Sequence, residues 1–111
     1  MEQNRDHYIN NSNLYKDKLA HCKKQIKTIL KKNVGEKGYV GGSQNVDNRA
    51  DDHSKNKPMD TMFILTTCKD LAQAIKLEKK LIELFGDKYL TNIGRGGAGL
   101  KKGENDIYFL F

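Results

Sequence analysis

The chain has 111 residues, of which 37% are hydrophobic and 31% are charged, and its formal net charge is +6. This length and composition fit one compact domain with a modest core. No run of 18 apolar residues occurs, and the opening residues lack the pattern of a signal peptide. We therefore expect a soluble intracellular protein, cytoplasmic or nuclear, with no membrane partner. The positive charge favours an anionic partner.

The first thirty-four residues divide into two segments by pattern. Residues 1–12 are polar and aperiodic, which predicts a flexible N-terminus. Residues 13–34 are expected to carry an amphipathic basic helix over 13–32. Its apolar positions recur at steps of three and four from Tyr15 through Leu19, Cys22 and Ile26 to Ile29, and Leu30 follows directly.

The polar face of this helix is rich in lysine. Such a face is usually a solvated surface, and the alternative is a contact for phosphate groups. The residues that we assign to nucleic-acid binding under that alternative are Lys23, Lys24, Lys27, Lys31, Lys37 and, later in the chain, Arg95. The two cysteines, Cys22 and Cys68, lack metal-site spacing and are interpreted as reduced packing residues.

Residues 38–42 predict a short strand rich in glycine. Glycine at Gly41 would let another group approach the backbone closely. Ser43 and Asn45 offer side-chain oxygens that can cap a helix running to about His53.

Tyr39, Arg49 and His53 could converge on one point in space. Arg49 and His53 stand four residues apart, so they share one face of the predicted helix. A phenol, a guanidinium and an imidazole together suit an anionic substrate such as a phosphodiester. The plain alternative is a strand, a polar turn and a solvated Asn/Asp-rich helix.

Met62 to Thr66 predict a buried strand, and Thr67 with Asp70 resembles a capping box that opens the next helix. Glu78 lies in the middle of the apolar stripe of that helix, so its carboxylate must be paired or metal-bound. A salt bridge to Arg49 is the structural alternative. The stripe consists of Leu71, Ala74, Ile75, Glu78, Leu81, Ile82 and Phe85.

In order and spacing, Tyr39-Val40-Gly41, the Ser-x-Asn turn, Arg49 and His53 resemble the YIG half of the GIY-YIG nuclease family. The resemblance implies that Glu78 holds the single catalytic metal, Mg²⁺ or Mn²⁺ (magnesium or manganese). It also implies that Asn92 and Gly41 support the site.

The family places a Gly-Ile-Tyr strand shortly before the YIG strand. Here Thr28-Ile29-Leu30 occupies that position, has no tyrosine and falls in a helical pattern. Asp106-Ile107-Tyr108, near the end of the chain, resembles the missing motif. In a circularly permuted domain the C-terminal strand would pair antiparallel with residues 37–42 and bring Tyr108 to the side of Tyr39.

The expected fold is α/β: a small central sheet of about three strands (37–42, 62–66 and 106–111) flanked by helices. It is GIY-YIG-like over residues 35–111, with an extra N-terminal helix. The resemblance implies a metal-dependent endonuclease that hydrolyses nucleic acid, with DNA favoured as substrate. Tyr39, Arg49, His53 and Tyr108 are the implied catalytic residues.

Two other functions fit the same residues. One is a GIY-YIG-like protein that binds nucleic acid or another phosphate ligand without cutting it. The other is an interaction or inhibitor protein that uses the basic N-terminal helix against an acidic partner. For a nuclease of this length, strict sequence specificity would need a homodimer or a larger recognition partner.

Overall fold

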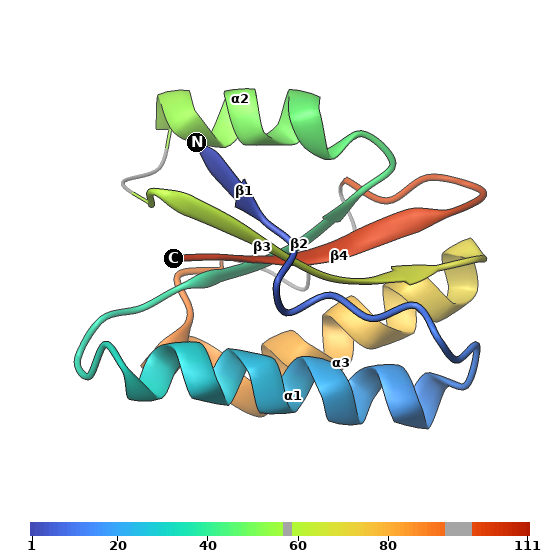
Figure 1. Ribbon diagram of the computed structural model, residues 1–111, viewed down its shortest axis with the longest axis horizontal. Helices are drawn as coiled ribbons and strands as arrows, with labels where there is room; N and C mark the ends of the chain where they lie inside the picture. Colours follow the sequence, from blue (N-terminus) through green and yellow to red (C-terminus); the bar gives the residue numbers. More distant parts are fainter. Residues whose placement is uncertain (57–58, 93–98) are drawn as a thin grey trace.

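The computed structural model describes residues 1–56, 59–92 and 99–111. Within these ranges the chain forms three helices and a four-stranded mixed sheet (Figure 1). It is thus a small α/β domain, as predicted, with four strands where about three were expected. The elements are β1 (Glu2–Asn4), α1 (Tyr15–Lys31), β2 (Tyr39–Ser43), α2 (Val46–Asn56), β3 (Thr61–Cys68), α3 (Leu71–Tyr89) and β4 (Asn105–Leu110).

The helices cover both faces of the sheet. Figure 1 shows α2 on one face and α1 beside α3 on the other. The larger apolar cluster lies under α1 and α3 and includes Ile26, Leu77, Leu81 and Phe109. The smaller cluster, under α2, consists of Val46, Ala50, Met62, Ile64, Tyr108 and Leu110.

Strand β4, the last in the sequence, lies inside the sheet. The strand order is β1-β3-β4-β2, and β4 is antiparallel to both of its neighbours. In the register with β2, Tyr39 faces Leu110 and Gly41 faces Tyr108. This confirms the prediction that the C-terminal strand pairs antiparallel with the strand carrying Tyr39.

The N-terminus departs from the prediction. The sequence predicts a flexible segment over residues 1–12, whereas Glu2–Asn4 form β1, parallel to β3. The backbone N–H of Glu2 donates to the carbonyl of Asp60, and that of Ile9 donates to Leu65. Because backbone groups make this pairing, the side-chain pattern of a polar segment gives no sign of it.

Helix α3 starts later than predicted. Strand β3 continues to Cys68, and the N-cap residue is Asp70, not Thr67; the Asp70 carboxylate accepts a hydrogen bond from the backbone N–H of Gln73 at 2.8 Å. Ile75 was also placed wrongly, since its exposed fraction is 44%. The buried residues of the helix are Ala74, Leu77, Glu78, Leu81 and Phe85.

The two cysteines are buried in the core, and neither forms a disulfide. Burial raises the pKa of the Cys68 thiol to about 11, so this thiol is protonated at neutral pH. Both observations agree with the prediction of reduced packing residues. None of the helices in the described part of the chain combines the length and apolar composition needed to cross a membrane.

Candidate active site

Strands β2 and β4 bring two tyrosines to the sheet face that α2 covers. Side chains alternate along a strand, so Tyr39 and Gly41 point the same way. Tyr108 is the partner of Gly41 in the register and therefore lies on that same face. The tyrosine from the end of the chain thus reaches the position predicted for the second phenol.

Gly41 makes this arrangement possible. A Cβ atom at position 41 would lie 2.5 Å from both Cζ and Oη of Tyr108, closer than real Cβ contacts allow. The close approach predicted for this glycine is therefore made by the Tyr108 ring, which packs directly on the β2 backbone.

His53 joins the two tyrosines. Its Nε2 lies 2.8 Å from the Tyr108 hydroxyl oxygen, within hydrogen-bond distance. Its ring centroid is 5.3 Å from that of Tyr39 and 5.7 Å from that of Tyr108. The helix is positioned for this by Asn45, whose side chain accepts a hydrogen bond from the Asn48 N–H at 3.1 Å, as expected of an N-cap.

Arg49, one turn before His53 on α2, places its guanidinium in the same site. It lowers the pKa of Tyr108 and forms an ion pair with Asp52, with Nη1 3.9 Å from the carboxylate. Its Nε is buried and has no hydrogen-bond partner among the described residues. A Cβ at Gly99 would lie 2.8 Å from Arg49 Nη2, so this glycine also permits a close approach.

Glu78 approaches β2 from α3, which covers the other face of the sheet. Its exposed fraction is 3%, as its place in the apolar stripe predicted. A Cβ at Gly42 would lie 3.0 Å from Glu78 Oε2 and 2.4 Å from a methyl carbon of Leu100. The adjacent glycines thus admit Tyr108 on one face and Glu78 on the other.

Asn92 fixes the strand that holds these groups. Its side-chain oxygen accepts a hydrogen bond from the Val40 N–H at 2.9 Å, and its amide donates to the Val40 carbonyl at 2.7 Å. Because β2 is an edge strand, these backbone groups have no neighbouring strand to pair with. Asn92 therefore pairs with the outer edge of β2 at Val40.

The pKa values of both phenols are raised above the ordinary value of 10.0. Burial is the main cause for Tyr39, the Glu78 charge adds to it, and Arg49 opposes it. For Tyr108, burial and then Tyr39 raise the pKa, while Arg49 lowers it. Both phenols are therefore neutral at neutral pH.

The lysines proposed for nucleic-acid contact are not part of this site. Lys23, Lys24, Lys27 and Lys31 belong to α1, on the sheet face opposite α2 (Figure 1). Lys37 is exposed shortly before β2.

Arg95 lies outside the described residues. Two further cations, Lys101 and Lys102, were missed and are exposed in the turn before β4. The Gln44 side chain, just after β2, donates a hydrogen bond to the Lys102 carbonyl. Only a knowledge of the strand pairing could have indicated that this turn lies near the site.

Glu78 is the buried carboxylate for which the resemblance implies a metal ion. Among the described residues no group of three or more His, Cys, Asp or Glu side chains gathers as a metal site. Mg²⁺ is commonly held by one or two carboxylates, with water and substrate phosphates as the other ligands. A buried carboxylate that lies against Gly42 and whose charge acts on Tyr39 fits that kind of site.

The chain has no match among protein-family models, curated proteins or solved structures. The GIY-YIG resemblance therefore stays a prediction.

Ionisation of Tyr108 should make the stability of the protein depend on alkaline pH. The fold favours the neutral phenol, so its contribution is fully present below the unfolded pKa and is lost as pH rises toward the raised folded value. We expect the free energy of unfolding of the wild type to fall above pH 10. The free energy of unfolding of the Tyr108→Phe variant should fall less steeply, with a slope that differs by about 1.4 kcal/mol per pH unit. Denaturant titrations over this pH range measure both slopes.

The slope is the diagnostic quantity, because Tyr108→Phe also removes a hydrogen-bond partner of His53 and lowers stability at every pH. Tyr89→Phe is the control, since the Tyr89 side chain is 40% exposed. Equal slopes for the wild type and Tyr108→Phe would contradict the assignment of a buried, neutral phenol.

Proposed function

We propose that this protein is a metal-dependent endonuclease that hydrolyses phosphodiester bonds of nucleic acid, with DNA as the favoured substrate. The observation that supports the proposal most is the convergence of Tyr39, Tyr108, His53 and Arg49 on one face of β2. Glu78 approaches the adjacent glycine of the same strand. These residues come from β2, β4, α2 and α3, so only the folded chain brings them together.

The two phenols differ in exposure, and this separates their roles. Tyr108 is fully buried, with its hydroxyl beside His53 Nε2, whereas Tyr39 is partly exposed. Tyr39 is therefore the phenol that a water molecule can reach. As the phenolate it would take a proton from the attacking water, while Tyr108 and His53 hold its surroundings in place.

Arg49 has two roles in this proposal. Its charge lowers the pKa of Tyr39, which favours the phenolate. The Arg49 side chain is 33% exposed, and its guanidinium would approach the phosphoryl oxygens, where negative charge develops in the transition state. Glu78 would hold Mg²⁺ or Mn²⁺, whose chemistry at this place is Lewis-acid stabilisation of the leaving oxygen.

A second function, binding of a phosphate ligand without cleavage, is favoured by one observation. Burial raises the pKa of both phenols, so neither is poised as a base in the free protein. A protein of this kind would retain DNA in a salt-sensitive manner and leave it intact.

Glu78→Gln should abolish cleavage while leaving folding and DNA retention largely unchanged. The amide keeps the shape of the side chain but removes the charge that holds the metal ion. Cleavage of plasmid DNA and DNA retention at matched salt measure the two effects. Glu83→Gln, an exposed position on the same helix, is the control and should cut like the wild type. Near wild-type cleavage by Glu78→Gln would show that Glu78 is structural.

Arg49→Ala should slow cleavage roughly 10²-fold and weaken DNA binding much less, because a donor that acts on the transition state affects the rate first. Single-turnover rates and binding constants for one DNA substrate separate these effects. Lys55→Ala, an exposed cation on the same helix, controls for the loss of one positive charge. Equal losses in rate and affinity would make Arg49 a phosphate clamp and not a catalytic residue.

A further inference from the structure

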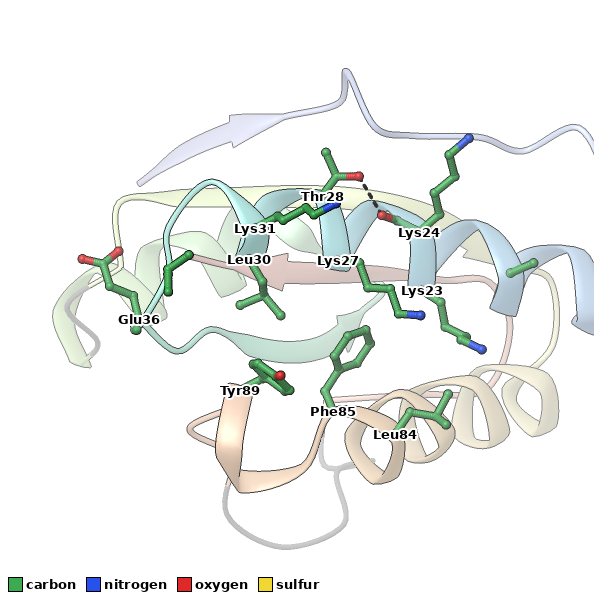
Figure 2. A pocket seen from close by; sticks show the side chains of 13 residues that line it. Lys23, Lys24, Lys27, Thr28, Leu30, Lys31, Glu36, Leu84, Phe85 and Tyr89 are labelled. Atoms are coloured by element: carbon green, nitrogen blue, oxygen red, sulfur yellow. Dashed lines mark hydrogen bonds between the residues drawn. The ribbon is translucent and has the colours of Figure 1, made fainter.

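A groove of about 860 Å³ lies between α1 and α3, on the sheet face opposite α2. Figure 2 shows side chains from both helices lining it. The proposed nuclease residues are not among its lining residues. The groove is thus a second surface with its own chemistry.

One wall of the groove is cationic. The lysines that line it are Lys23, Lys24, Lys27 and Lys31, all from α1. Among the described residues none of these four ammonium groups forms an ion pair. Glu36 is the one acidic lining residue in that part of the chain. Figure 2 shows the Lys23 and Lys27 side chains pointing toward Phe85, so this wall of the groove is positively charged.

The rest of the groove is largely apolar. Leu30, Val34, Leu84, Phe85 and Tyr89 line it. The exposed fraction is 90% for Val34, 44% for Leu84 and 40% for Tyr89, so large apolar side chains stay in contact with water. Covering this surface would release free energy in proportion to the apolar area buried.

We infer that this groove binds an acidic amphipathic helix of a partner protein. Apolar side chains on one face of such a helix would fill the floor, while aspartates or glutamates along one edge would face the lysines. Lys23 and Lys31 lie roughly 12 Å apart along the axis of α1, which is about two helical turns. Both the charge pattern and the apolar floor are complementary to that occupant.

The groove is less suited to a nucleic acid strand. Single strands bind in cationic grooves where bases stack on exposed aromatic faces. Phe85 is only 8% exposed, and its ring makes a T-shaped contact with the Tyr89 ring. The Lys88 ammonium lies 5.4 Å from the centroid of the Tyr89 ring. An apolar floor in which one aromatic ring is buried and the other already contacts that ring favours protein side chains over bases.

Docking here does not depend on the proposed nuclease activity. The lining residues lie on α1, on the connection to β2 and on the C-terminal part of α3. Arg49 and His53 lie on α2. A bound helix would occupy the opposite face of the sheet. The groove could therefore recruit a recognition partner without covering the α2 side of the site.

Binding of designed peptides tests the inference. The probe is a fluorescent helical peptide of about 14 residues, with leucines at helix-face spacing and glutamates along one edge. Its matched counterpart carries lysines in place of the glutamates, and a labelled single-stranded oligonucleotide is the third probe. Fluorescence anisotropy with the full chain measures each affinity.

We expect the acidic peptide to bind at least roughly tenfold more tightly than its lysine counterpart. Lys27→Glu combined with Lys31→Glu should weaken the acidic peptide roughly tenfold and improve binding of the lysine peptide. Leu84→Ser should weaken both peptides, because both use the apolar floor.

The matched control is Lys79→Glu combined with Lys80→Glu, two exposed lysines of α3 that do not line the groove. It changes the net charge equally and should leave the affinity for the acidic peptide within roughly twofold. Equal effects of the two double variants, or no binding of the acidic peptide, would overturn the inference. Binding of the oligonucleotide that only the groove variant loses would assign the groove to nucleic acid.

Discussion

The packing of the Tyr108 ring on Gly41 is the contact on which the rest of the site depends. It fixes where β4 sits beside β2, and with it the position of the hydroxyl that meets His53. A side chain at position 41 would force the ring off the strand and separate the phenol from α2. Gly42 likewise leaves room for the Glu78 carboxylate on the opposite face of the strand. Two adjacent glycines therefore set the geometry of four elements.

Local spacing made part of the fold and site predictable. The helix with Arg49 and His53 on one face follows from a cap and a four-residue step, and the burial of Glu78 follows from its place in an apolar stripe. If β4 is assumed to pair with β2, the alternation of side chains along the strands places Tyr108 on the same sheet face as Tyr39. Features set by tertiary contacts gave no such signal. Strand β1 pairs through its backbone alone, and Lys101 and Lys102 reach the site region through a turn.

The sheet face on which the α1 lysines lie was not predictable either. The lysines of α1 form a regular helical face in the sequence, but nothing in that pattern says which face of the sheet the helix will cover. The structure places them on the sheet face opposite α2. At the site itself, Arg49 and Glu78 act in opposite directions on the pKa of Tyr39. Burial is the largest cause that raises the pKa of that phenol, and these two charges add opposing effects.

The most direct measurement is incubation of the wild-type protein with plasmid DNA and with branched DNA, in Mg²⁺ or Mn²⁺ and in chelator. The account predicts cleavage of at least one of the two substrates with metal and none with chelator, because the proposed mechanism needs a divalent ion held by Glu78. DNA that is retained at low salt but stays intact with either metal would contradict it. That result would support a protein that binds phosphate groups without cutting.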